Sequence, residues 1–231
     1  GLWRQRRQND ATESEFAMKY EAYCVDGIWA KALFSLFFAA MLAGCALTSK
    51  PVGADSYDFG PEPLLAAPAP AAMTALPPPP LALADIDTSQ AFDGRSVLYR
   101  LDYADAQQLR PYAHARWSAP PAQLVRQRLR EILSQRRTVV NAGTSNVPLV
   151  LRIELQEFSQ QFASPAQSSG VIRLVATLSR ITPAGELPVA QRTVEVQRPA
   201  PSADAPGGVK ALTAATDAAA QELAQWLASL R

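Results

Sequence analysis

The sequence has little of the chemistry that most enzymes use. His114 is the single histidine, so a nucleophile activated by a histidine base would depend on that one residue. Cys24 and Cys45 are the two cysteines, whereas a metal centre needs three or four neighbouring His, Cys, Asp or Glu ligands. The sequence also has no glycine-rich phosphate loop and no Gly-x-Ser-x-Gly elbow. We therefore predict no catalytic residues, no metal and no cofactor, and we do not expect an enzyme.

The sequence also lacks a charge excess of either sign. It has 22 Lys and Arg residues against 21 Asp and Glu residues, a formal net charge of +1, and this balance does not indicate a nucleic-acid partner. One mild cluster of arginines falls on a single expected helix and comprises Arg126, Arg128, Arg130, Arg136 and Arg137. Such a cluster could face anionic lipid or a partner, but it is more typical of a solvated helix face.

No apolar run near the N-terminus is long enough to cross a bilayer, which takes about 20 residues. Residues 32–43 form a shorter run that only Ser35 interrupts, and Lys19 and Lys31 flank it. This pattern predicts a signal peptide over residues 18–44, starting at Met18. Residues 1–17 are polar without an apolar period, and we interpret them as an upstream translation artefact, with a cytosolic tail as the alternative.

The signal peptide ends in a motif that resembles the lipobox of bacterial lipoproteins at every position, namely Leu42, Ala43, Gly44 and Cys45. The resemblance implies cleavage before Cys45 and acylation of both its thiol and its new amine, giving a palmitate-type membrane anchor. Ala46 stands where an aspartate would imply retention at the inner membrane, so the resemblance implies the periplasmic face of the outer membrane. The alternative is a short apolar segment that ends in cysteine by coincidence.

Residues 45–80 are rich in proline and alanine. Nine of the 19 prolines fall here: Pro51, Pro61, Pro63, Pro68, Pro70 and the run 77–80. This composition disfavours both a sheet and a continuous helix, and it predicts a semi-rigid spacer between the lipid and a domain. A proline-rich ligand is the alternative, and the segment 57–61 is unusually aromatic for a linker.

Residues 81–231 have the periodicity of one folded domain. Strands are predicted over residues 81–87, 96–103, 147–156, 171–181 and 189–198, with a short edge strand at 108–117 and a loop at 164–170. One helix is predicted from Pro120 with the apolar stripe Leu124, Val125, Leu129, Ile132 and Leu133, and another runs from Leu212 to Leu230. The order β-β-(β)-α-β-β-β-α predicts an α+β fold with an antiparallel sheet packed against two helices.

From Leu81 onward, the sequence resembles the ABC-type transport auxiliary lipoprotein family, which includes the PqiC-like lipoproteins. The resemblance rests on the lipobox, Tyr57 near the mature start, and the proline-rich segment, followed by residues 92–100 and 109–117 and the helix that follows 120–124. It covers roughly the whole mature chain.

The resemblance implies an accessory subunit that docks a lipid-transport conduit at the outer membrane. The implied partners are an ABC ATPase, an inner-membrane permease and a periplasmic MCE-domain protein, and association with further copies of the chain stays open. We expect Tyr112, Arg116 and Trp117 to contribute to docking, with core packing as the alternative and, for Trp117, the favoured one. A scaffold or pilot lipoprotein for an envelope complex, without a role in lipid transport, is the second hypothesis.

Overall fold

The computed structural model describes residues 53–61, 78–143 and 147–230, and these ranges form part of one compact unit that begins at Gly53. The predicted segments 1–17 and 18–44, and Cys45 itself, lie outside the described residues. Within the described ranges, no helix is both long enough and apolar enough to cross a membrane.

The described strands form one mixed sheet of eight strands in the order β1-β4-β3-β6-β2-β5, with β7 on the opposite edge of β6 and β8 outside β7. Because β6 has 16 residues, one of its edges holds both β2 and β3, and both run parallel to it. Their bounds are β1 Asp55–Tyr57, β2 Leu81–Thr88, β3 Ser96–Leu101, β4 Asp105–Trp117, β5 Val139–Asn141, β6 Leu149–Ser164, β7 Gln167–Thr182 and β8 Gly185–Pro199.

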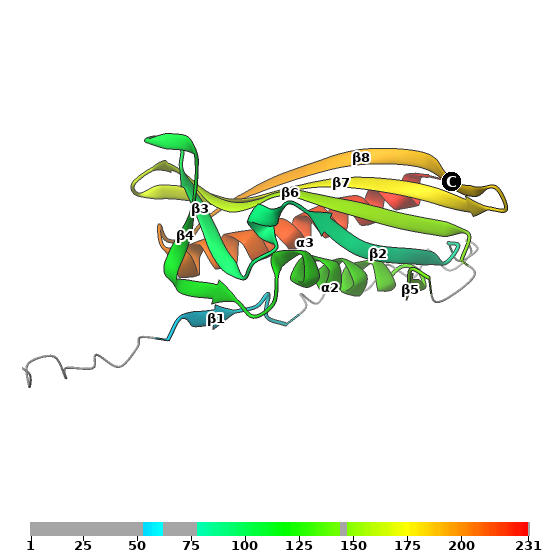
Figure 1. The fold of residues 1–231 in the computed structure, drawn as a ribbon, viewed down its shortest axis with the longest axis horizontal. Coiled ribbons are helices and arrows are strands. Elements are labelled where there is room, and N and C mark those ends of the chain that lie inside the picture. The colour runs from blue at the N-terminus through cyan, green and yellow to red at the C-terminus, as the bar shows by residue number, and fades with distance from the viewer. Residues whose placement is uncertain (1–52, 62–77, 144–146, 231) are drawn as a thin grey trace, which may run out of the picture. The chain divides into compact units, whose positions relative to one another are not determined.

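Two helices, α2 (Pro121–Ser134) and α3 (Ala205–Ser229), lie against the same face of this sheet (Figure 1). Pro121 begins α2 because the first helical position needs no N–H donor. The whole predicted stripe of α2 is buried, and Leu212, Leu223 and Leu227 of α3 are buried with it. Burial of these side chains between sheet and helices is the main source of stability in the described fold.

The α+β class, with a sheet packed against two helices, is confirmed. The predicted order corresponds to β2-β3-β4-α2-β6-β7-β8-α3, and the structure adds the short strands β1 and β5 and the single-turn helix η3 (Gln90–Phe92). The sheet is mixed rather than wholly antiparallel, since β2 and β3 both pair in parallel with β6. Apolar alternation fixes which side chains face the core, but it does not encode the direction of a neighbouring strand.

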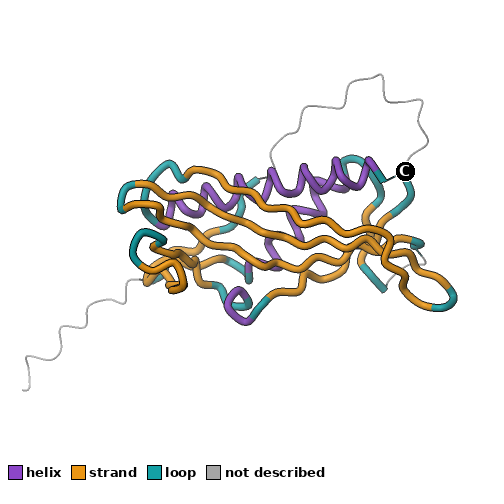
Figure 2. Tube along the Cα trace, turned by 90° about the horizontal axis from the view of Figure 1, so that it is seen from above, coloured by secondary structure: helices purple, strands orange, loops and turns teal. Residues whose placement is uncertain are grey.

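The loop predicted at residues 164–170 is mostly strand. β6 continues to Ser164 and β7 begins at Gln167, so the two strands form a long hairpin (Figure 2). Gly170 is therefore not a turn residue. A Cβ at this position would lie 2.5 Å from the backbone nitrogen of Leu212 and 2.6 Å from the carbonyl carbon of Ala211. The glycine allows α3 to approach the backbone of β7 closely.

Gly170→Ala is expected to destabilise the fold by about 1–3 kcal/mol, because the backbone of α3 must move away from β7 to admit the methyl group. Thermal or urea unfolding measures the change. Gly94→Ala is the matched control, since a Cβ there meets nothing within 4 Å. An unchanged stability of Gly170→Ala would mean that α3 does not pack at this distance.

Candidate functional site

The first described residues form a strap along the domain, which we define as Asp55–Pro61. Its first part, β1, pairs in parallel with Ala115–Trp117 of β4. The N–H of Ser118 donates to the carbonyl of Tyr57 at 2.7 Å and extends this pairing past the end of β4. The strap therefore belongs to the sheet, although it lies in a stretch whose composition predicted a spacer.

The strap continues into the core through one aromatic side chain. Phe59 is 8% exposed, and its ring lies edge-on to Trp117 at 5.5 Å between centroids and 6.1 Å from Phe158. The next residue, Gly60, has φ +63°, a conformation that favours glycine, and its N–H donates to the Asp58 carboxylate at 2.8 Å. This turn directs the Phe59 and Gly60 carbonyls towards α2.

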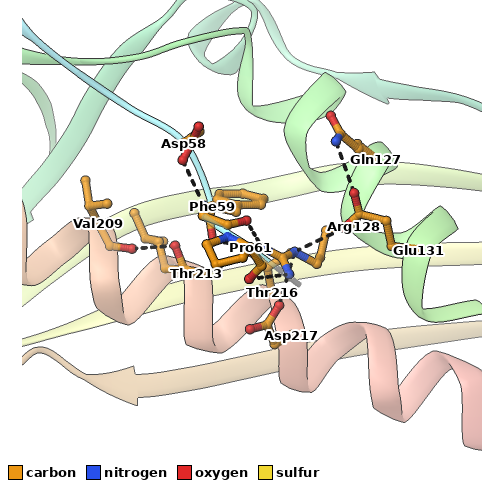
Figure 3. A network of polar contacts seen from close by, with 12 residues as sticks. Asp58, Phe59, Pro61, Gln127, Arg128, Glu131, Val209, Thr213, Thr216 and Asp217 are labelled. Atoms are coloured by element: carbon orange, nitrogen blue, oxygen red, sulfur yellow. Dashed lines mark hydrogen bonds and ion pairs between the residues drawn. The ribbon is translucent and has the colours of Figure 1, made fainter. Parts of the chain in front are cut away.

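Arg128 of α2 donates hydrogen bonds to both of these carbonyls (Figure 3). Its side chain is 2% exposed, and its Nη2 donates to the carbonyl of Phe59 at 2.7 Å and to that of Gly60 at 3.0 Å. On the other side, its Nε lies 3.4 Å from the Asp217 carboxylate on α3 and 3.7 Å from that of Glu131. A planar guanidinium can bond in several directions at once, which a lysine ammonium on a flexible stem does less precisely. Arg128 thus ties the strap to both helices.

The arginine cluster predicted on one helix does not act as one solvated face, and Arg136 and Arg137 lie beyond the end of α2. Arg126 donates to the carbonyls of Leu83 and Ala84 at 3.3 and 3.0 Å and pairs with Asp85. Arg128 is buried, so the interpretation as a solvated face is wrong for this residue. Position 128 follows Val125 by one helical turn and therefore falls on the buried stripe, a signal that the sequence already contained.

The three residues expected to dock a partner do not form one surface. Trp117 is 1% exposed and packs between Phe59 and Phe158, so it is a core residue in the described structure. Its neighbour Arg116 is exposed. Tyr112 is half-buried, so that of the three only Arg116 lies fully at the surface.

The hydroxyl of Tyr112 has a defined partner inside the domain. It donates to Gln160 Oε1 at 2.8 Å, and its ring lies 4.6 Å from that of Tyr99. Burial, with smaller contributions from Tyr99 and Asp204, raises the pKa of Tyr112 above the ordinary value of 10. The hydroxyl therefore stays protonated at neutral pH and acts as a structural donor.

A hollow of about 150 Å³ lies between the strap and α2, lined by residues that include Asp58, Gln127 and Glu131. It is smaller than the roughly 300–1,000 Å³ of typical ligand pockets. Among the described residues, no three His, Cys, Asp or Glu side chains gather where they could hold a metal ion. The contacts described around the strap attach it to the sheet and to both helices.

Asp204 caps α3 at the end nearest the strap. Its carboxylate accepts from the N–H of Gly207 at 2.8 Å and from the hydroxyl of Ser202 at 2.6 Å. The hydrogen bond from Ser202, followed by that from Gly207, holds the pKa of Asp204 below its ordinary value of 3.8. The capped end of α3 carries Gly208, whose missing Cβ leaves room for the side chain of Gln160.

Asp204→Ala is expected to cost about 1 kcal/mol of stability at pH 7, because the helix loses its capping acceptor. Since the folded-state pKa is lower than the unfolded one, the carboxylate stabilises the fold above about pH 4, and this contribution is lost as the pH falls through the lowered pKa. Urea unfolding at several pH values should show the difference between variant and wild type narrowing below about pH 4. A difference that widens in acid would contradict this role, and Asp204→Asn, which keeps an acceptor, is the matched control.

One comparison with known proteins identifies a family. The ABC-type transport auxiliary lipoprotein component family matches residues 64–224. The chain belongs to this family. Among curated proteins, none matches the sequence. The fold is similar to the crystal structure of protein XCC0632 from Xanthomonas campestris, with 21% identity over 63% of this chain and 81% of that one and a TM-score of 0.55. It is also similar to the crystal structure of an uncharacterized protein, with 14% identity over 76% of this chain and 99% of that one and a TM-score of 0.58. At these identities, the two structures support the fold alone.

The strap shortens the spacer that was predicted between Cys45 and the domain of this ABC-type transport auxiliary lipoprotein. Eight of the nine prolines between residues 45 and 80 are at or beyond Pro61, where the strap ends, so most of the proline-rich sequence connects β1 to β2. The predicted division at residue 80 is thus corrected by the structure, because residues 53–61 belong to the folded unit. Only residues 46–52 lie between Cys45 and this unit.

If Cys45 carries the lipid, as predicted, the connection between the lipid and the domain is short. Asp55 follows Cys45 by ten positions (55 minus 45), and an extended chain spans at most about 3.6 Å per residue, or roughly 36 Å in all. Because β1 is paired with β4, this length is counted from a defined position on the domain, the start of the strap at Asp55. Nothing in the family or in the similar structures indicates an enzymatic activity.

Proposed function

We propose that the chain is a lipid-anchored periplasmic subunit of an ABC/MCE-type intermembrane lipid transport system that docks the transport conduit at the outer membrane. The observation that carries the proposal is the strap. A chain that is acylated at Cys45 and bound by Arg128 at Phe59 and Gly60 presents its domain from one fixed point. An accessory subunit that docks a conduit needs such a defined attachment, whereas a catalyst would need convergent reactive groups.

The family supports the coarser part of this proposal, since it is a family of lipoproteins that serve ABC-type transport. The choice of the outer membrane follows from Ala46, which by resemblance is not an inner-membrane retention signal. The hollow beside the strap is, at about 150 Å³, smaller than a typical ligand pocket, which favours docking over enclosure of a lipid at this place. The partners would be an MCE-domain protein that spans the periplasm, together with its permease and ATPase.

Mild crosslinking in cells, followed by purification through a C-terminal tag from outer-membrane extracts, tests the proposal. Mass spectrometry should identify an MCE-domain protein among the co-purifying proteins. The Cys45→Ala variant should leave the membrane fraction and lose this partner, because anchoring would place the domain at the conduit. Recovery of envelope-assembly or pore proteins without any MCE component would reject the proposal in favour of the scaffold hypothesis.

A further inference from the structure

The turn between β7 and β8 exposes an unusual amount of apolar surface. Within this tip, which we define as residues 181–189, Ile181 is 46% exposed, Leu187 60% and Val189 49%. Gly185 forms the turn with φ +122°, and its carbonyl accepts from the hydroxyl of Thr182 at 2.8 Å, so the turn has a defined geometry. In the β7–β8 pairing Leu187 lies opposite Arg180 and Ile181 opposite Glu186, so these two apolar side chains project from opposite faces of the hairpin. Exposed apolar side chains beside polar residues are typical of interaction sites.

The charges around the tip favour an acidic counterpart. The Nε and Nη2 of Arg152 donate to the Glu186 carboxylate at 2.9 and 2.8 Å, so this carboxylate is already neutralised within the sheet. Arg180, directly opposite Leu187 in the β7–β8 pairing, is exposed and has no side-chain partner among the described residues. The tip therefore offers exposed apolar side chains on both faces of the hairpin, and the adjacent Arg180 adds one uncompensated cation on the face of Leu187.

The tip lies away from the strap. β1 runs parallel to β4, β4 runs antiparallel to β3, and β3 runs parallel to β6, so β1 is antiparallel to β6. The strap packs on Phe158 in the second half of β6, whereas the tip follows the pairing of Leu149 with Arg180 at the start of β6. In Figure 1, β1 lies below the left half of the sheet, and the β7–β8 turn lies at its right end.

We infer that this tip inserts into an apolar groove with an acidic rim on the MCE-domain partner. The inference rests on the proposed function and adds the surface and chemistry of docking. A projecting hairpin fits a concave partner surface, and Arg180 pairs with a carboxylate at the rim of the groove. The membrane that would hold Cys45 is the less suitable occupant, because the strap, which begins ten positions after Cys45, lies away from the tip.

The test uses three variants of the full-length, tagged lipoprotein and the same crosslinking purification. The double variant L187S/V189S removes the apolar contact, and Arg180→Glu reverses the charge while keeping the apolar side chains. The matched control is Tyr103→Ser, because Tyr103 is 49% exposed on the other projecting turn, between β3 and β4. Recovery of the MCE-domain protein is measured relative to the tagged chain, together with binding to phosphatidylglycerol-containing vesicles and crosslinking between copies of the chain.

We expect both tip variants to recover at least about tenfold less MCE-domain protein than wild type, as for the loss of a central interface contact, and Tyr103→Ser to recover as much as wild type. Equal recovery by the tip variants would overturn the inference and leave the proposed function standing. If wild type itself recovers no MCE-domain protein, both fall. If the tip variants lose vesicle binding or self-crosslinking instead of the partner, the occupant is a membrane or a second copy, and the inference is wrong.

Discussion

Arg128→Met is expected to lower the free energy of unfolding by about 3–5 kcal/mol. The substitution leaves the Phe59 and Gly60 carbonyls and the Asp217 carboxylate without the cation that binds them in a site where Arg128 is 2% exposed. Removing one partner of a buried ion pair is costly because the other charge stays desolvated. For a chain of this length, the melting temperature should fall by roughly 6–20 °C.

The same variant should release the strap selectively. Limited proteolysis should cut near residues 55–61 in Arg128→Met before it cuts the rest of the domain, because those residues lose their link to α2 and α3. Arg136→Ala is the matched control, since Arg136 is exposed just after α2 and should change stability by less than about 0.5 kcal/mol. If Arg128→Met behaves like Arg136→Ala, the strap is not held by Arg128.

Trp117→Ala should destabilise the protein by about 3–5 kcal/mol, because it leaves a cavity between Phe59 and Phe158. Chemical denaturation measures the loss, and the strap should become accessible together with the core. If Trp117→Ala also recovers less of the MCE-domain partner, we attribute that loss to unfolding and not to a lost docking contact.

Arg116→Ala separates folding from docking at the neighbouring position. Its side chain is exposed, so the variant should unfold within about 0.5 kcal/mol of wild type. For comparison, if Trp117→Ala were as stable as wild type, the described packing of Trp117 would be wrong. Reduced partner recovery by Arg116→Ala with unchanged stability would support the predicted docking role of Arg116.

The sequence predicted the elements whose apolar residues repeat over several turns. The stripe of α2 and the inward side chains of β7 are buried where the periodicity placed them, as are Leu212, Leu223 and Leu227 of α3. Leu230, the last residue of the predicted repeat, is instead 39% exposed. Long periodic segments carry this information because their burial is a property of the segment itself. The two helices and the main strands could therefore be placed from the apolar pattern alone.

The strap could not be placed from the sequence, because its structure depends on distant residues. β1 has only three residues, and its pairing with β4 and the bonds from Arg128 are made with residues about 60 to 70 positions away in the chain. The surrounding prolines indicated a spacer, and the aromatic residues Tyr57 and Phe59 were the one contrary signal. Arg128 was likewise grouped with its charged neighbours, although its helical position lies on the buried stripe.

At Gly170 the sequence predicted a loop where the structure has a strand. The sequence around Gly170 is small and polar, which is typical of a loop, yet the residue lies inside β7 because α3 passes close to it. The three apolar residues at the β7–β8 tip also match the pattern of a strand, but the structure leaves them exposed.

The mass of the N-terminal peptide of the membrane-extracted protein tests the lipid-anchored strap most directly. The peptide is expected to start at Cys45 and to carry three acyl groups, two through the diacylglyceryl thioether and one on the amine. That result would place the lipid roughly 36 Å or less from the strap at full extension. A mature chain that starts upstream of residue 45, with an unmodified Cys45, would contradict the proposed anchoring, because the strap would then hold no anchor.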